Sequence, residues 1–167
     1  PISEADFAKF FWEVWDRLEQ NPHRALETTP LRPVYFRFMT ILAFHVFISL
    51  EVSATLLEVG IGGMYDSTNI VQHPVVTGVT ALGLDHTAIL GHTLEEVAWQ
   101  KAGIFKPGVP ALSVEQPENA QAVLQKYAKQ VQASSFQVVP VNRDLLHVKL
   151  GPVSYTHLRA HETRGNL

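Results

Sequence analysis

Glu58 is the first residue of this sequence whose type and position together suggest chemistry. It closes a short apolar run, and a turn that contains Gly60, Gly62 and Gly63 follows directly. A carboxylate at the exit of a buried strand, beside backbone that glycine adopts readily, is typical of metal and phosphate sites in α/β proteins. The alternative is a structural carboxylate that accepts hydrogen bonds from the amides of the turn, and the glycine cluster can equally be an ordinary tight turn.

Two further side chains could join Glu58 at one site. His86 follows a second apolar run, with Asp85 before it, and Lys101 closes a helical pattern. Residues that follow consecutive elements of one sheet can converge at the same edge of that sheet. His86 can instead be a hydrogen-bonded loop residue. Lys101 can instead neutralise the C-terminal end of its helix or pair with a nearby glutamate. These alternatives stay open.

A polar cluster of Asp66, Thr68 and Asn69 follows the glycine turn. Aspartate and asparagine side chains often bond to backbone two residues further on, so an Asx-type turn is one interpretation of this cluster. We assign no role to the remaining histidines of residues 1–150, which are His23, His45, His73, His92 and His147.

These side chains need a scaffold, and the hydrophobic pattern predicts alternating helices and strands. Ser3 suits the N-cap of an amphipathic helix, and Thr93 and Glu96 have the spacing of a capping box. Short, nearly continuous apolar runs indicate buried strands. The pattern predicts helices over residues 3–20, 34–50, 93–102 and 117–133, and strands over residues 54–59, 75–82, 109–114 and 136–141. We therefore expect an α/β fold with a parallel sheet and flanking helices.

Length and composition limit the classes of function. A chain of 167 residues predicts one domain with room for a buried core. The net charge of −3 gives no electrostatic reason to expect a nucleic-acid partner. The sequence has no cysteine, which fits a reducing compartment. The longest apolar stretch, near residues 39–50, contains His45 and is too short to span a bilayer.

Three segments resemble the folylpolyglutamate synthase family, which belongs to the Mur ligases. They are the glycine-rich run at residues 56–71, the Gly-Leu-Asp-His turn at residues 83–86, and Ala-Trp-Gln-Lys-Ala-Gly-Ile-Phe-Lys-Pro-Gly-Val-Pro at residues 98–110. The segments occur in the order and spacing of the family. The resemblance covers roughly residues 1–150 and implies part of the family's central ATP-binding domain, which has a fold like that of the P-loop NTPases.

The resemblance implies an ATP-dependent ligase that adds L-glutamate to tetrahydrofolate through a γ-amide bond in one-carbon metabolism. The reaction would pass through an acyl phosphate. ATP and Mg²⁺ are the implied cofactors, with a monovalent cation as a further candidate. The implied partners are small-molecule substrates, and the implied protein is a monomer without a membrane span. Two alternatives remain: a dihydrofolate synthase or other Mur-type amide ligase, and an inactive fragment from a chimeric transcript.

The resemblance also implies roles for individual residues. Glu58 and His86 would be Mg²⁺ ligands, with Asp85 orienting His86. Lys101 would be a catalytic lysine that becomes carbamylated. The residues expected near substrate or nucleotide are Gly60, Gly62, Gly63, Asp66, Thr68 and Asn69.

The two ends of the chain carry separate expectations. The family's phosphate-binding loop, Gly-x-x-Gly-Lys-Gly-Ser/Thr, occurs nowhere in the sequence. We therefore expect residues 1–150 to be a partial domain that is inactive alone. Residues 152–163 resemble the in-frame translation of a sequencing-library adapter, so we expect residues 151–167 to be an artefactual tail. The N-terminal segment that distinguishes cytoplasmic from mitochondrial forms is not visible, and both locations remain expectations.

Overall fold

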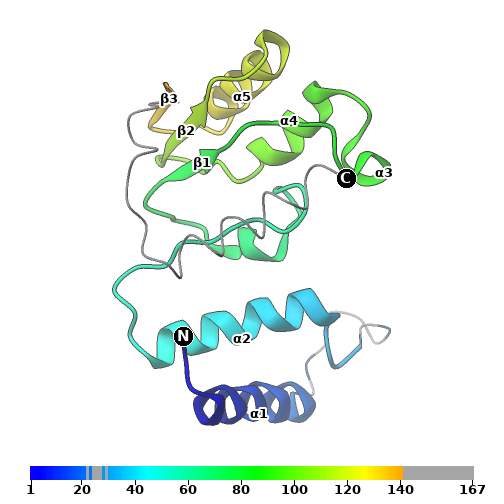
Figure 1. Ribbon diagram of the computed structural model, residues 1–167, viewed down its shortest axis with the longest axis vertical. Coiled ribbons are helices and arrows are strands. Elements are labelled where there is room, and N and C mark those ends of the chain that lie inside the picture. Colours follow the sequence, from blue (N-terminus) through cyan, green and yellow to red (C-terminus); the bar gives the residue numbers. More distant parts are fainter. Residues whose placement is uncertain (22, 24–27, 29, 141–167) are drawn as a thin grey trace.

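The computed structural model describes residues 1–21, 23, 28 and 30–140. They form a helical hairpin and a small α/β lobe, which are joined by a segment without regular secondary structure at residues 51–59 (Figure 1). The tail expected over residues 151–167 lies outside the described residues. Within the described part of the chain, no helix combines the length and the apolar character needed to cross a bilayer.

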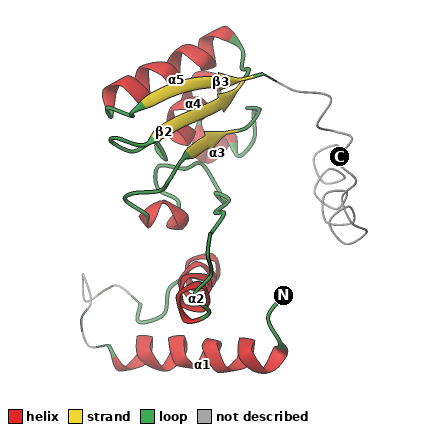
Figure 2. Cartoon of the chain, turned by 90° about the vertical axis from the view of Figure 1, so that its left-hand side faces the viewer, coloured by secondary structure: helices red, strands yellow, loops and turns green. Residues whose placement is uncertain are grey.

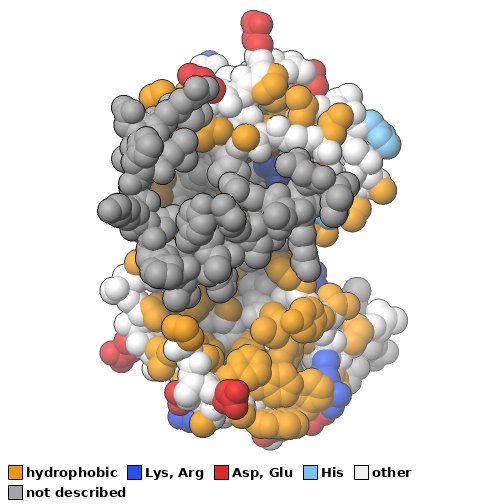
Figure 3. Space-filling view, viewed as in Figure 1, with side chains coloured by type: hydrophobic (Ala, Val, Ile, Leu, Met, Phe, Trp, Pro, Cys, Tyr) orange, Lys and Arg blue, Asp and Glu red, His pale blue; other side chains and the backbone are white. Residues whose placement is uncertain are grey.

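Helices α1 (Glu4–Gln20) and α2 (Tyr35–Ser49) form the hairpin, which confirms the first two predicted helices. The Ser3 hydroxyl caps α1 by accepting a hydrogen bond from the Asp6 N–H at 3.1 Å. The two helices share a buried core made of Phe10, Val14, Phe38, Leu42 and Val46. Other apolar side chains stay on the surface of the hairpin, which the space-filling view shows as an orange region (Figure 3).

The α/β lobe contains a parallel sheet of three strands in the order β1-β2-β3. The strands are β1 (Thr77–Val79), β2 (Pro110–Val114) and β3 (Ser135–Val139). Parallel strands need crossover connections, and helices α4 (Leu94–Ala102) and α5 (Glu118–Gln130) supply them. Both helices pack against one face of the sheet (Figure 2). The shared core consists of Val79, Ala98, Ala102, Phe105, Ala111, Ala120, Leu124 and Ala128.

The capping box at the start of α4 is confirmed. The Thr93 hydroxyl accepts a hydrogen bond from the Glu96 N–H at 3.2 Å, and the Glu96 carboxylate accepts one from the Thr93 N–H at 3.0 Å. Hydrogen bonds from the His92 N–H, the Thr93 hydroxyl and the Thr93 N–H lower the pKa of Glu96. This reciprocal pairing satisfies amide groups that the first turn of a helix leaves without partners.

The predicted strand over residues 54–59 is wrong. This segment has no regular secondary structure, and the Leu56 side chain is 98% exposed. An apolar run becomes a strand only where a neighbouring strand pairs with its N–H and C=O groups. Among the described residues, β1 pairs with β2 and no strand pairs with residues 54–59.

Other boundaries differ from the predictions by smaller amounts. Strand β1 covers three residues of the predicted 75–82. Helix α5 ends at Gln130, with Pro117 as its N-cap, and β3 ends at Val139. The short helices η1 (Ser67–Ile70) and α3 (Thr87–Leu90) were not predicted, because four residues are too few for a helical period to show.

Candidate functional site

Asp66 organises the loop that follows Glu58. One carboxylate oxygen accepts hydrogen bonds from the N–H groups of Gly60 and Ile61, at 3.2 and 3.1 Å. The other accepts from the Thr68 N–H at 2.9 Å and from the Thr68 hydroxyl at 2.6 Å. Burial alone would raise the pKa of Asp66, but the bonds from Thr68, Ile61 and Gly60 together lower it. The Asx-type turn is therefore confirmed, and the Asp66 carboxylate serves its own loop.

Two glycines let this loop approach the end of α4. Gly62 has a φ of 73°, in the left-handed region that glycine adopts at little cost. A Cβ on Gly63 would lie 2.8 Å from the Gln100 carbonyl oxygen and 3.1 Å from the Lys101 Cα, so backbone contacts backbone here. The Met64 N–H donates to the Gln100 carbonyl oxygen at 2.9 Å. The glycine loop is thus docked directly on the helix end that carries Lys101.

Helix α2 contacts the same loop from the other side. A Cβ on Gly60 would lie 2.6 Å from Cζ of Phe36. The Phe36 ring therefore occupies the space that a side chain at residue 60 would fill.

The three residues proposed from the sequence occupy different settings. Glu58 is exposed, immediately before the glycine loop, while Lys101 is half-buried in the last turn of α4. The amides of Gly60 and Ile61 donate to Asp66 and that of Met64 donates to Gln100, so these amides do not hold the Glu58 carboxylate as the structural alternative required. Within the described residues, no group of three His, Asp or Glu side chains is placed to hold a metal ion.

His86 occupies the N-cap of α3 in a left-handed conformation, with φ 50° and ψ 39°. Its N–H donates to the Asp85 carboxylate at 2.7 Å. The ring Nε2 of His86 lies 3.7 Å from the other oxygen of that carboxylate, which is ion-pair distance but not hydrogen-bond distance. Asp85 thus fixes the backbone of His86 more directly than its ring.

Gln116 holds the chain that leads from β1 toward His86. Its side-chain Nε2 donates to the Thr80 carbonyl oxygen at 2.8 Å, and its Oε1 accepts from the Leu82 N–H at 3.0 Å. Sequence reasoning missed this residue. The available signal was its position just after a predicted strand, which is the same position that singled out Glu58.

A cavity of about 650 Å³ lies beside the polar cluster and strand β1, and Thr55, Leu56, Leu57 and Val59 line it while Glu58 does not. Thr68 and Asn69 line it, together with His73 and Lys106, which the sequence did not indicate. Burial lowers the pKa of Lys106, whose Nζ lies 3.5 Å from the Asn69 carbonyl oxygen. This cavity therefore adjoins part of the predicted substrate region.

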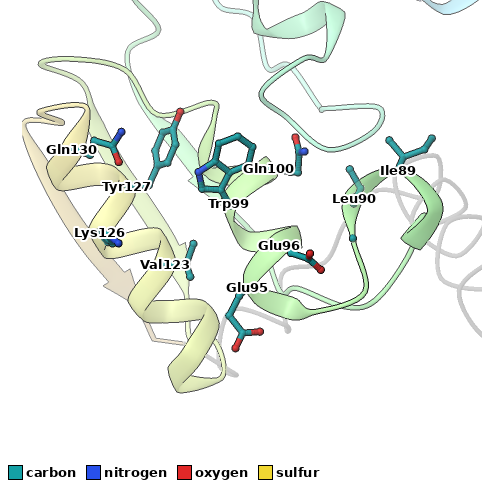
Figure 4. A pocket seen from close by; sticks show the side chains of 11 residues that line it. Ile89, Leu90, Glu95, Glu96, Trp99, Gln100, Val123, Lys126, Tyr127 and Gln130 are labelled. Carbon is teal, nitrogen blue, oxygen red and sulfur yellow. The ribbon is translucent and has the colours of Figure 1, made fainter.

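A second cavity, of about 530 Å³, lies over α3, α4 and α5, and none of the predicted site residues lines it (Figure 4). The rings of Trp99 and Tyr127 meet edge to face there, with centroids 6.4 Å apart. Burial, followed by the influence of Tyr65, raises the pKa of Tyr127.

Comparison with known proteins identifies the class of this chain. No family model matches it. It is 52% identical over 131 residues to the mitochondrial folylpolyglutamate synthase of Homo sapiens. The aligned region makes up 78% of this chain and 22% of that protein. It is 47% identical over 157 residues to a folylpolyglutamate synthase of Saccharomyces cerevisiae. That aligned region makes up 90% of this chain and 28% of the yeast protein.

A solved structure supports the same relationship. A folylpolyglutamate synthase in complex with AMPPCP and folate superposes with a TM-score of 0.68 at 32% identity, over 83% of this chain and 32% of that chain. The fold is therefore the parallel α/β fold found in part of these synthases. The chain is a homologue of folylpolyglutamate synthase, and it spans about a quarter of the length of the curated relatives that it matches.

Proposed function

We propose that this chain is part of an ATP-dependent ligase that adds L-glutamate to tetrahydrofolate through a γ-amide bond. The identity of 47–52% to folylpolyglutamate synthases supports this proposal. The structural observation that carries it is the docking of the glycine loop on the helix end that bears Lys101, with the Met64 N–H bonded to the Gln100 carbonyl oxygen. This contact brings two segments that the sequence nominated separately into one place.

Glu58, His86 and Lys101 are the residues proposed to hold Mg²⁺. The exposed Glu58 carboxylate suits a hard cation that prefers oxygen ligands. A carbamate on Lys101 would supply a second carboxylate-type ligand: the neutral amine adds to carbon dioxide, forming an N–C bond and releasing one proton. When bound, Mg²⁺ offsets the negative charge of the phosphate groups.

The proposed reaction has two steps. The γ-carboxylate of the folate attacks the terminal phosphorus of ATP, which forms an acyl phosphate and releases ADP. The amine of glutamate then attacks the acyl carbon, the amide bond forms, and phosphate leaves with loss of a proton from the amine. In this chain, the amides of Gly60 and Ile61 are bonded to Asp66 and hold the shape of the loop. In this proposal the loop holds the backbone that follows Glu58.

The remaining expectations extend this proposal. Residues 1–150 would form part of the central ATP-binding domain, and residues 151–167 would be a tail unrelated to it. The matches cover 78–90% of the chain and leave the rest of it unmatched. The substrates would be reduced folate, glutamate and ATP, with cytoplasmic or mitochondrial location. Deleting residues 151–167 should leave the thermal unfolding temperature unchanged, and a cooperative loss of stability would contradict the division.

A chimera tests the activity. Residues 1–140 of this chain replace the matching part of the human synthase, and transfer of labelled glutamate is measured with tetrahydrofolate and with dihydropteroate as acceptors. We expect tetrahydrofolate to be used, and Glu58→Gln in the same chimera to abolish transfer without changing its circular dichroism. Full turnover by the Glu58→Gln chimera would overturn the role of Glu58. Use of dihydropteroate alone would overturn the proposed acceptor.

A further inference from the structure

We propose that Asn69 is a positioning residue that locks the glycine loop onto the C-terminal end of α4. Its side-chain nitrogen donates to the Met64 carbonyl oxygen at 3.1 Å and to the Gly103 carbonyl oxygen at 3.0 Å. An asparagine amide has two N–H donors, and both are used in this junction. The inference deepens the proposed function, on which its metal-binding part rests.

The two acceptors lie on different segments of the chain. Met64 is in the glycine loop, and Gly103 is the residue that ends α4. Asn69 and Gly103 are 34 residues apart, so this bond is a tertiary contact rather than a local turn. The Asn69 side chain therefore joins the loop to the helix.

The junction depends on backbone packing that leaves no room for side chains. A Cβ on Gly103 would collide with Met64, and a Cβ on Gly63 would lie 2.8 Å from the Gln100 carbonyl oxygen. The last carbonyl groups of a helix lack partners within the helix. Here the Met64 N–H is a second donor to the Gln100 carbonyl oxygen, which also accepts from the Gly103 N–H at 3.3 Å, and the Asn69 amide donates to the Gly103 carbonyl oxygen.

Asp66 and Asn69 thus have separate tasks. Asp66 bonds within its own loop and fixes the shape of that loop. Asn69 fixes the place of the loop relative to α4, and so the spacing between Glu58 at the start of the loop and Lys101 in the last turn of the helix. Because its donors are already engaged, the Asn69 amide acts on the site through this spacing and not by donating to a substrate.

The test uses the 167-residue chain, with hydrogen exchange and Mn²⁺ as probes. Asn69→Asp keeps the size of the side chain but places an acceptor against two carbonyl oxygens. We expect exchange of the Met64 N–H to accelerate about tenfold or more, as for the loss of a hydrogen-bonded junction. Exchange of the Leu112 N–H in β2 should stay within about twofold, because the sheet does not depend on this junction. Gln72→Ala is the matched control, because the Gln72 amide donates within its own segment, to the Ile70 carbonyl oxygen.

Mn²⁺ broadening of amide signals then tests the consequence for the site. In the unsubstituted chain, one Mn²⁺ concentration should broaden signals near both Glu58 and Lys101. In Asn69→Asp the two regions should respond at different concentrations, while Gln72→Ala behaves as the unsubstituted chain does. Broadening of both regions at one concentration in Asn69→Asp would overturn the spacing role.

The outcomes separate this inference from the proposed function. If Mn²⁺ broadens neither region in the unsubstituted chain while Met64 exchange still accelerates in Asn69→Asp, the metal site fails and the lock stands. If Met64 exchange in Asn69→Asp stays within about twofold of the unsubstituted chain, the lock itself is wrong. Should Asn69→Asp unfold, Asn69→Ser, which has a shorter side chain and one donor, is judged by the same two criteria.

Discussion

The side-chain amide of Gln116 donates to the Thr80 carbonyl oxygen at 2.8 Å, at the point where β1 has ended. The same amide accepts from the Leu82 N–H at 3.0 Å. One side chain thus supplies the donor and the acceptor that a neighbouring strand residue would otherwise provide. The chain that leads to His86 is held by this contact after the regular sheet has stopped.

Replacing Gln116 by leucine keeps the size of the side chain and removes both bonds, together with a longer one from the Gln116 Nε2 to the Ser113 hydroxyl at 3.3 Å. We expect the free energy of unfolding of the α/β lobe to fall by about 1–2 kcal/mol, the net value of one partly buried and one exposed hydrogen bond. Denaturation followed by the amide signals of β2 measures it, and exchange of the Leu82 N–H should accelerate. Gln125→Leu on the exposed side of α5 is the control. Equal stability of the two variants would contradict the bridging role.

Asp66→Asn should destabilise the loop in a pH-dependent way. The pKa of Asp66 is lowered below its ordinary value of 3.8, so its contribution to stability is complete above pH 3.8 and is lost as the pH falls through the lowered pKa. At pH 7 we expect a loss of about 1–2 kcal/mol, reduced because much of the carboxylate is solvated. Urea unfolding at neutral pH and below pH 3.8 measures this difference, which should shrink in acid. Asp16→Asn, at an exposed residue, is the control. If the stability loss caused by Asp66→Asn grows in acid, the proposed role of the Asp66 carboxylate is wrong.

Leu124→Ala tests the core that supports the site. Leu124 on α5 is fully buried in the core that α5 shares with the sheet and α4, so its truncation leaves a cavity. We expect a loss of about 2–5 kcal/mol in the free energy of unfolding of the α/β lobe. Val138→Ala, at a side chain that is 43% exposed, should cost much less. A similar loss for both variants would mean that the described core does not control stability.

The chain by itself should neither bind nor hydrolyse ATP. The phosphate-binding loop of this class supplies backbone amides, a lysine and a hydroxyl to the phosphates and Mg²⁺, and its sequence pattern does not occur in these 167 residues. Isothermal titration with Mg²⁺–ATP measures this directly. Micromolar affinity for ATP would show that nucleotide binding does not depend on that loop.

Local signals in the sequence predicted local structure well. Ser3 before α1, and Thr93 with Glu96 at the start of α4, act over three residues and are confirmed. The Asx-type turn at Asp66 likewise depends on near neighbours. The parallel α/β fold followed from the alternation of helices and strands, and it is confirmed.

Features that depend on distant partners could not be predicted in the same way. Residues 54–59 have the composition of a strand, but composition does not show whether another strand is there to pair with them. The bond from Asn69 to Gly103 and the bonds of Gln116 cross 34 to 36 residues, and no spacing rule covers that distance. The roles of Glu58, His86 and Lys101 remain predictions.

The contact between Phe36 and Gly60 has a consequence for how such chains diverge. A Cβ at residue 60 would lie 2.6 Å from the tip of the Phe36 ring, so a substitution there requires that the half-exposed ring rotate away, that residue 36 become smaller or that α2 shift. In an alignment of relatives, these two columns should therefore covary, although 24 positions separate them in the sequence. The residue type at position 36 on the helical hairpin would then indicate whether position 60 of the glycine loop carries a side chain.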